Sequence, residues 1–173
     1  VERVYINDRM TYKDGFDYMR GNPGVKLMAN SDIYFEPDII EIANADFTNR
    51  LLCMSRHDLD WDSKIIPPKP CQILGGGPPS EVKESQSSDA WIWRDIPPFK
   101  SNIYLGVYCC ETLMLSNAVT KGIEVINVGR LYNAIHVHWS GVRAQTNSEG
   151  ESFYSRDDFG DFRIAENKSE IGL

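Results

Sequence analysis

The sequence predicts an α/β domain with a mixed, mostly parallel central sheet flanked by helices. Two short apolar runs, at 25–29 and 51–54, alternate with helix start signals at Thr11 and Pro37. Strands that alternate with helices are typical of a sheet built from right-handed crossovers. With 173 residues, the chain has room for one hydrophobic core of ordinary size.

The first third of the chain contains the clearest local signals. A short strand is expected at 4–6. A helix is expected to begin after Thr11, because Thr11 as N-cap and Asp14 three residues later resemble a capping box. The run 25–29 is apolar apart from Lys26, which is the pattern of a strand covered on both faces in a parallel sheet.

The segment 57–88 interrupts this rhythm with prolines, a glycine run and many serines. A segment of this length without periodicity is usually a lid or a disordered loop, so we expect 66–88 to be poorly ordered without a ligand. Further elements are predicted beyond it: strands at 89–93, 103–105, 125–126 and 135–138, a helix at 110–121 that ends at Gly122, and a loosely packed polar tail at 144–173.

Composition excludes several classes of function. The chain has 18 basic and 25 acidic residues, a net charge of −7, and no basic run, which argues against nucleic-acid binding. No apolar stretch approaches the about 20 residues of a membrane span. The four cysteines form no CxxC pair, so a structural zinc site is not expected, and buried reduced thiols in an intracellular protein are the simplest interpretation.

A polar triplet, Asn30-Ser31-Asp32, directly follows the most hydrophobic strand. Ligands of open α/β sheets bind beyond the carboxyl ends of strands, so this is a favourable place for a site. If the strand continues, Asn30 and Asp32 share a face, and their oxygens suit a divalent cation such as Mg²⁺ or Mn²⁺. An Asx turn that closes the strand is the alternative explanation.

Two of the three histidines, His136 and His138, also stand at i and i+2, and Gly141 and Arg143 follow them. Imidazole is a common metal ligand, and a guanidinium grips phosphate with two hydrogen bonds. A pair of structural histidines on a strand is the alternative.

Arg56 and Asp89 stand at the ends of two other predicted strands. Arg56 suits an anionic or sugar ligand, and Asp89 suits proton acceptance from a hydroxyl or a hydrogen bond to a sugar. A solvated ion pair is the alternative. Glu111 is interpreted as a favourable charge at a helix N-terminus.

Two familiar catalytic motifs are absent. The glycine run at 75–77 lacks the Gly-Lys-Ser/Thr ending of a phosphate loop and is followed by two prolines. The chain has no Gly-x-Ser-x-Gly elbow, and its Cys-His and Ser-His spacings do not indicate a hydrolase.

Five segments in order resemble a group of GT-A-type glycosyltransferases that includes bacterial members and the glycosyltransferase domain encoded by large chlorella viruses. These segments are Ala29–Phe35, Ser55–Asp58, Ser88–Trp93, Tyr104–Gly106 and His136–Arg143. The resemblance covers residues 1–143, which would form the GT-A-like domain, and leaves 144–173 as the tail.

The resemblance implies metal-dependent transfer of a sugar from a nucleoside-diphosphate sugar to a hydroxyl of a glycan or glycoconjugate. Asn30-Ser31-Asp32 would stand for the Asp-x-Asp signature, with Asp32 on an Mn²⁺ or Mg²⁺ ion. His138 would complete the metal shell, with His136 as a further ligand. The ion would then offset charge on the leaving diphosphate.

Further roles are implied for the donor pocket and for the reaction. Asn30, Ser31, Gly141 and Arg143 would contact the donor, and the expected catalytic residues are Asp89 and Arg56, with Asp89 near the acceptor or the donor sugar. Cys109–Thr112 departs from the family, whose members often have Gly-Cys-Asp-Asn at this place.

The resemblance also carries expectations about the whole protein. The first strand of the fold has no counterpart before Val1, so the chain is expected to be a fragment that lacks part of the donor pocket and is inactive by itself. A cytoplasmic location in a bacterium or in a virus-infected cell is expected. A glycan-binding module without catalysis, on the same scaffold, is the alternative function.

Overall fold

The computed structural model describes residues 9–59, 64–66, 70–71, 83–84, 88–96, 98–107, 110–137 and 163–173. The predicted strand at 4–6 and most of the expected loop at 66–88 lie outside the described residues. The same holds for His138, Gly141 and Arg143, and for most of the expected tail.

The larger sheet is mixed, as predicted, but it is not mostly parallel. Its five strands lie in the order β1 (Lys26–Ala29), β8 (Ala90–Trp93), β3 (Arg50–Met54), β9 (Glu124–Asn127) and β11 (Arg163–Ile164). β8 is antiparallel to both of its neighbours, whereas β3, β9 and β11 are parallel to one another. β8 follows β3 only after the long segment 57–88, whose length allows either strand direction, and here β8 runs antiparallel to β3.

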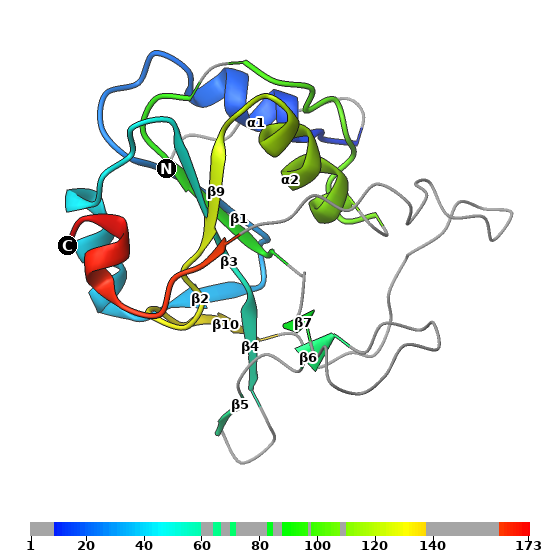
Figure 1. Ribbon diagram of the computed structural model, residues 1–173. Helices are drawn as coiled ribbons and strands as arrows, with labels where there is room; N and C mark the ends of the chain where they lie inside the picture. The colour runs from blue at the N-terminus through cyan, green and yellow to red at the C-terminus, as the bar shows by residue number, and fades with distance from the viewer. Residues whose placement is uncertain are drawn as a thin grey trace, which may run out of the picture.

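A smaller sheet stands beside the first and takes its strands from the segments that leave it (Figure 1). It contains, in order, β2 (Ile33–Phe35), β10 (Ala134–His136), β4 (Arg56–Leu59) and β5 (Ile65–Ile66). β10 is antiparallel to β2 and parallel to β4. A separate antiparallel pair joins β6 (Pro70–Cys71) to β7 (Lys83–Glu84).

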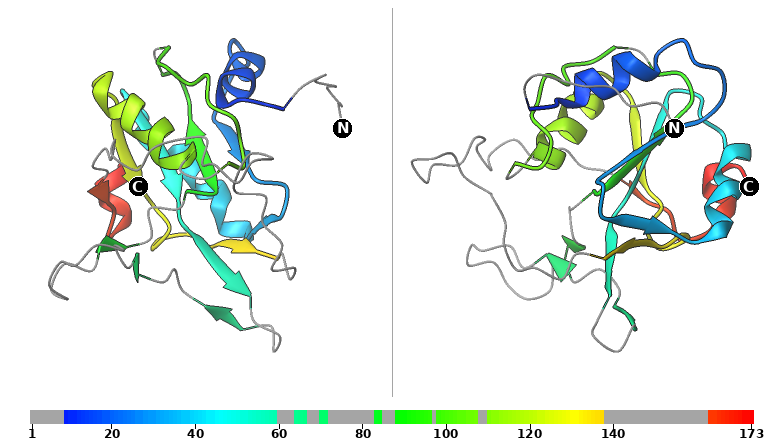
Figure 2. Two further views of the ribbon diagram at one scale, coloured as in Figure 1. Left: turned by 90° about the vertical axis from the view of Figure 1, so that its right-hand side faces the viewer. Right: turned by 180° about the vertical axis from the view of Figure 1, so that it is seen from behind.

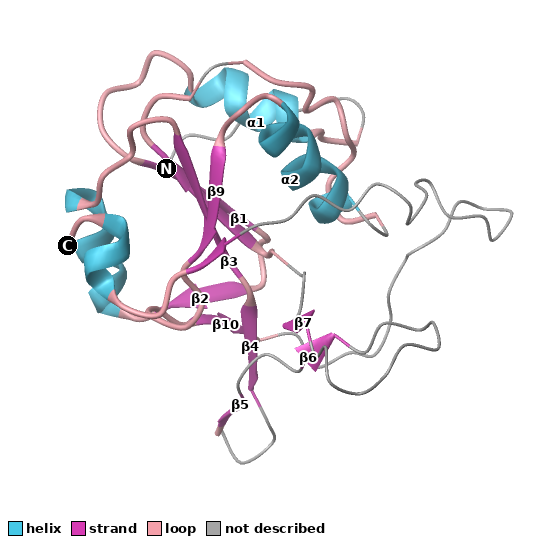
Figure 3. Cartoon of the chain, in the orientation of Figure 1, coloured by secondary structure: helices cyan, strands magenta, loops and turns pink. Residues whose placement is uncertain are grey.

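Helical segments cover both faces of the larger sheet, which places the core in two layers (Figures 2 and 3). The helices α1 (Tyr12–Met19) and α2 (Cys110–Thr120) pack on one face with Leu51 and Trp91. The 3-10 helices η1 (Pro37–Asn44) and η2 (Lys168–Ile171) pack on the other, together with Leu52 and Ile92. In the described part of the chain, no helix is long and apolar enough to cross a membrane.

The central strands are buried on both faces because their successive side chains enter different layers. Leu51 and Cys53 of β3 face α1 and α2, whereas Leu52 and Met54 face the opposite layer, and all four are fully buried. Burial raises the pKa of the Cys53 and Cys110 thiols to about 12, so both are protonated. The expectation of buried reduced thiols is confirmed for these two cysteines.

Two sequence signals for helix ends are confirmed. Thr11 is the N-cap of α1 in a capping box: its hydroxyl accepts from the Asp14 N–H, and the Asp14 carboxylate accepts from the Thr11 N–H at 2.8 Å. Gly122 follows α2 with φ of +84°, a backbone conformation that favours glycine.

Three other expectations differ from the structure. The strand at 25–29 is not buried on both faces but forms the edge strand β1, in which Lys26 is buried and Leu27 exposed. At 103–105 there is one β-bridge, between Tyr104 and Thr11, in place of a strand. Residues 56–59, assigned mainly to a loop, form β4, because the parallel strand β10 supplies their backbone partners.

The expectation of a loosely packed tail is wrong for residues 163–173. β11 extends the larger sheet beside β9, and Ala165 and Ile171 are fully buried in the second core layer. Composition alone predicts a tail here because only these few side chains are apolar and face inward. The charged residues Arg163, Glu166 and Lys168 form ion pairs on the surface.

Replacing the buried Ile171 by alanine is therefore expected to destabilise the whole fold. Removing its side chain leaves a cavity in the second core layer, and the expected loss is about 2–4 kcal/mol in free energy of unfolding. Urea denaturation measures this loss. The matched control is Ile40→Ala, whose side chain is 76% exposed and whose loss is expected to stay below about 0.5 kcal/mol. Equal losses in the two variants would contradict the packing of η2.

Candidate functional site

Polar side chains gather where three neighbouring strands of the larger sheet end. Asn30 follows β1 and Ser55 follows β3, while Asp89 precedes the antiparallel strand β8. Backbone hydrogen bonds continue the sheet across this edge, from the Asn30 N–H to the Asp89 carbonyl and from the Asp89 N–H to the Met54 carbonyl, both at 3.0 Å. The three strand ends therefore lie side by side.

Asp89 is the buried centre of this edge. It is 4% exposed, and its Oδ1 accepts a hydrogen bond of 2.9 Å from the Asn30 amide nitrogen. The guanidinium of Arg56, the first residue of β4, lies 3.6 Å from the same oxygen and 3.3 Å from Asp58. A buried carboxyl group requires partners, and Arg56 and Asn30 supply them for Asp89.

His136, at the end of β10, contacts two carboxylates through its two ring nitrogens. Its Nε2 lies 3.1 Å from Asp32 Oδ2, and its Nδ1 lies 3.2 Å from Asp58 Oδ1. The register of the smaller sheet causes this, because His136 stands opposite Asp58 on one side and opposite Ile33 on the other. The imidazole is only 11% exposed, so its orientation is fixed.

These contacts form one continuous series, which we call the strand-end cluster: Asn30, Asp89, Arg56, Asp58, His136 and Asp32. The sequence predicted five of the six as site residues and missed Asp58, which stood in a segment assigned to a loop. Asp58 was detectable only through its spacing of two from Arg56, which places both side chains on the same face of a strand.

The triplet at 30–32 differs from its expected geometry. The chain turns there, with the Ile33 N–H donating to the Asn30 carbonyl, so Asn30 and Asp32 do not share a strand face. Asn30 binds Asp89 while Asp32 contacts His136, and the two residues are the two ends of the cluster. Ser31 between them is exposed. The predicted donor contacts of Ser31, Gly141 and Arg143 and the metal role of His138 stay predictions.

Glu111, in the first turn of α2, also lies near the strand-end cluster. Burial raises its pKa above the ordinary value, and the charge of Asp89 raises it further while that of Arg56 lowers it. Glu111 therefore interacts with the strand-end cluster from the helical layer. The interpretation of Glu111 as a charge at a helix N-terminus is therefore incomplete, because burial is the largest cause of its raised pKa.

The neighbouring histidine, His57, belongs to the core and not to the cluster. Side chains alternate along β4, so His57 faces away from Arg56 and Asp58 and is 8% exposed. Burial lowers its pKa, and its Nδ1 has no hydrogen-bond partner among the residues that the structure describes. These observations describe a neutral, structural imidazole.

Buried Asn127, at the end of β9, fixes the point where the chain passes from the larger sheet to the smaller one. Its amide nitrogen donates to the Ser55 hydroxyl at 2.7 Å, and its amide oxygen accepts from the backbone N–H groups of Ser55 and Gly129. Ser55 directly precedes Arg56. The position of the Arg56 side chain thus depends on Asn127.

The cluster fits a divalent cation in two respects. Adjacent ligands of an octahedral Mg²⁺ ion lie about 3.0 Å apart, since each is about 2.1 Å from the metal, and Asp32 Oδ2 and His136 Nε2 are separated by 3.1 Å. A metal-bound histidine usually donates its other N–H to a carboxylate. Asp58 is placed for this role, because its Oδ1 lies 3.2 Å from His136 Nδ1. Among the described residues, no group of three His, Cys, Asp or Glu side chains converges on one point.

The charge of the site also favours a cation. Four carboxyl groups, those of Asp32, Asp58, Asp89 and Glu111, stand near one guanidinium and one imidazole. Such a balance concentrates positive ions and repels a bare phosphate, which would need a cation between itself and the protein.

Comparison of the chain with protein-family models, with curated proteins and with solved structures finds no match.

The raised pKa of Glu111 predicts a measurable effect of pH on stability. Between the unfolded and the folded pKa of Glu111, this carboxyl binds its proton more fully in the folded chain, so its contribution to stability falls as pH rises through the interval. Glu111→Gln removes this loss, and the variant is expected to gain stability relative to wild type as pH increases from about 4.5 towards neutrality.

Urea denaturation of both proteins over this pH range measures the difference in their free energies of unfolding. The titration of His57 cancels in this difference, because both proteins contain His57. The exposed Asp38→Asn is the control and is expected to show no such trend. A constant difference between Glu111→Gln and wild type would contradict the burial of the Glu111 carboxyl.

Proposed function

We propose that the chain belongs to an enzyme that transfers a sugar from a nucleoside-diphosphate sugar to a hydroxyl acceptor on a glycan and that requires a divalent cation. The observation that carries the proposal is the alignment of Asp32, His136 and Asp58, whose separations of 3.1 and 3.2 Å suit a metal ligand pair with a carboxylate behind the imidazole. The resemblance of the five sequence segments to GT-A-type glycosyltransferases supplies the substrate class.

In this proposal Asp32 and His136 hold an Mn²⁺ or Mg²⁺ ion, and Asp58 orients the imidazole. When bound, the ion offsets the negative charge that develops on the leaving diphosphate. The carboxylate and imidazole come from turns and strands of the smaller sheet, whose register fixes both, so little rearrangement is needed when the ion arrives.

Asp89, Arg56 and Asn30 act as a rigid polar group that positions the sugar. The contacts of Arg56 and Asn30 with one Asp89 oxygen hold this carboxylate in place, and a carboxylate can accept a hydrogen bond from a sugar hydroxyl. Arg56 is part of this group and adds positive charge beside the donor.

Glu111 is the carboxyl in the site best suited to exchange a proton with the acceptor hydroxyl. A general acid–base group works best when its pKa lies near the working pH, and burial moves the pKa of Glu111 upward from that of an ordinary glutamate. Asp89 was the carboxylate expected in this role from the sequence. Its compensation by Arg56 and Asn30 favours sugar binding instead.

A glycan-binding module without catalysis is the second candidate. It is favoured by the same contacts of Asp89, because a carboxylate held in place by a guanidinium and an amide can bind hydroxyl groups without taking part in a reaction. Donor hydrolysis or sugar transfer by the chain separates the two, since only a transferase releases the nucleoside diphosphate.

The metal arrangement predicts a specific effect of Asp58→Asn. Loss of the carboxylate behind a metal-bound histidine typically lowers metal affinity by about 10- to 100-fold, and we expect this reduction for Mn²⁺. Titration calorimetry gives the affinity, and the broadening of the His136 ring resonances by the paramagnetic ion locates it. Asp46→Asn is the matched control, because Asp46 lies on the surface and contacts Arg50. Unchanged Mn²⁺ affinity in Asp58→Asn would exclude the proposed arrangement.

Donor binding is expected to depend on the ion and on Asp32. Uridine- and guanosine-diphosphate sugars are titrated into the chain with Mn²⁺ and with a chelator, and binding is expected only with the metal. Asp32→Asn is expected to weaken donor binding by at least about tenfold, the effect of losing one charged metal ligand. The control Asp38→Asn is expected to bind like wild type. Equal donor affinity with and without metal would remove the metal from the mechanism.

A further inference from the structure

The contacts of Asp89 limit the kind of sugar that can bind at this end of the strand-end cluster. The inference rests on the proposed function, in which Asp89, Arg56 and Asn30 position the sugar. Asp89 is 4% exposed, and its Oδ1 accepts from the Asn30 amide at 2.9 Å and lies 3.6 Å from the Arg56 guanidinium. A ligand that approaches this end therefore meets an acid that its neighbours hold in a fixed position.

Arg56 is the only arginine or lysine of the strand-end cluster, and its guanidinium is engaged on two sides. Its Nε lies 3.3 Å from Asp58 Oδ1, and a terminal nitrogen lies 3.6 Å from Asp89 Oδ1. A sugar carboxylate could pair with this guanidinium only by displacing one of the two acids. Displacing Asp89 would leave a buried carboxylate without its cationic partner, which is costly.

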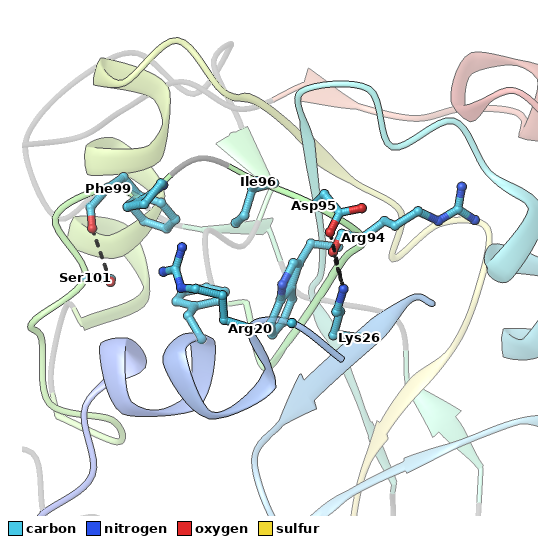
Figure 4. A pocket seen from close by; sticks show the side chains of 11 residues that line it. Arg20, Lys26, Arg94, Asp95, Ile96, Phe99 and Ser101 are labelled. Carbon is cyan, nitrogen blue, oxygen red and sulfur yellow. Dashed lines mark hydrogen bonds and ion pairs between the residues drawn. The ribbon is translucent and has the colours of Figure 1, made fainter. Parts of the chain in front are cut away.

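Lys26 does not supply a further positive charge to the cluster. It stands three residues before Ala29, which pairs with Ala90 beside the cluster, and three residues of a strand span about 10 Å. Figure 4 shows Lys26 beside Arg94 and Asp95 at the far end of the strand. Its ammonium donates to the Arg94 carbonyl at 2.6 Å and lies 3.6 Å from Asp95. The charge of Lys26 is therefore used at that end.

Glu111 shows how the surroundings of Asp89 affect a further carboxyl group. Burial is the largest cause that raises the pKa of Glu111, and the charge of Asp89 adds to it, while the charge of Arg56 acts in the opposite direction. The net effect favours the neutral form of this acid. A sugar carboxylate at the same end would experience the same burial and the same repulsion.

Hydroxyl groups also suit this end better for their hydrogen bonding. An ionised carboxyl group only accepts hydrogen bonds, so Asp89 and Asp58 require ligand groups that donate. A sugar hydroxyl both donates and accepts, whereas a sugar carboxylate only accepts. A carboxylate in the place of a hydroxyl therefore adds a like charge and removes a donor.

We propose that the strand-end cluster accepts sugars without a negative charge, such as neutral hexoses, and rejects sugars that carry a carboxylate, such as uronic acids. Asp89 is the residue that makes this selection, because Arg56 and Asn30 hold it in a buried position at the sugar. Like charges brought together at a binding site suppress the wrong partner. The selection applies to the transferase and to the glycan-binding module alike.

The test compares uridine-diphosphate glucose with uridine-diphosphate glucuronate, which differ only at C6, where a hydroxymethyl group is replaced by a carboxylate. Titration calorimetry with saturating Mn²⁺ gives both affinities, in about 0.15 M salt, where the net charge of −7 on the chain is largely screened. We expect the glucose donor to bind at least about tenfold more tightly. The galactose and galacturonate donors repeat the comparison with the C4 hydroxyl inverted.

Asp89→Asn preserves the shape of the side chain and removes its charge. The affinity ratio of glucose to glucuronate donor is expected to fall at least about threefold in this variant, because Arg56 then becomes available to the sugar acid. Asp38→Asn removes the same charge at an exposed position and is expected to keep the wild-type ratio. Urea denaturation verifies that Asp89→Asn folds, and the wild-type ratio tests the inference without it.

The possible outcomes separate the inference from the proposed function. Equal affinity of wild type for the two donors, or tighter binding of the glucuronate, would overturn the inference and leave the proposed function in place. Binding of neither donor with Mn²⁺ present would reject the proposed function, and the inference with it. An unchanged ratio in a folded Asp89→Asn would exclude Asp89 as the selecting residue.

Discussion

The hydrogen bonds of the Asn127 side chain hold together the two sheets on which the rest of the structure depends. One amide satisfies both the backbone and the hydroxyl of Ser55 and also the N–H of Gly129, at the place where the chain leaves β3 for β4. This region is fully buried, so an unsatisfied N–H here would be costly. Gly129 has no room for a side chain, since a Cβ would lie 3.0 Å from the Ser55 backbone. The close approach of these two segments sets the position of Arg56, and through the parallel pairing of β4 and β10 it also sets that of His136.

The two ends of β1 and β8 differ in electrostatic character. At one end four carboxyl groups lie near Arg56 and His136, and at the other Lys26 contacts Asp95 while Arg20 contacts Asp17. The strands between them are packed by Trp91 against Tyr12 and by Trp93 against Phe16. These aromatic contacts are short-ranged and rigid, which keeps the two charged regions apart along the sheet.

The sequence was most informative where one short pattern determines one local structure. The capping box at Thr11, the glycine after α2 and the buried runs of β3 and β8 are all confirmed. Most of the strand-end cluster was also predictable, because polar residues directly after apolar runs must collect at one edge of a sheet. Strand direction was not, since β8 and β1 pair across a long segment whose length leaves either direction open.

Other features required the folded chain. The turn at Asn30–Ile33, which separates Asn30 from Asp32, has no glycine or proline to mark it. The partnership of Asp58 with His136 depends on the parallel pairing of β4 and β10, which links residues 78 positions apart. The packing of 163–173 could not be predicted from composition, because the two buried residues Ala165 and Ile171 are outnumbered by charged side chains. For Asp58 and for residues 163–173 a long-range contact decided the outcome, and no local pattern encodes one. The turn at Asn30–Ile33 is local, and the sequence allowed a turn there as the alternative to a continued strand.

The alternation of side chains along β4 makes the alignment of this strand unusually resistant to slippage. Arg56 and Asp58 point to one side and the buried His57 to the other. A displacement by a single residue would exchange the sides, bringing a guanidinium and a carboxylate into the apolar layer and the imidazole out of it. Burying those two ions away from their native partners is costly, so the misaligned strand would be far less stable than the native one. The alternation of Arg56, His57 and Asp58 therefore favours a single register between β4 and β10.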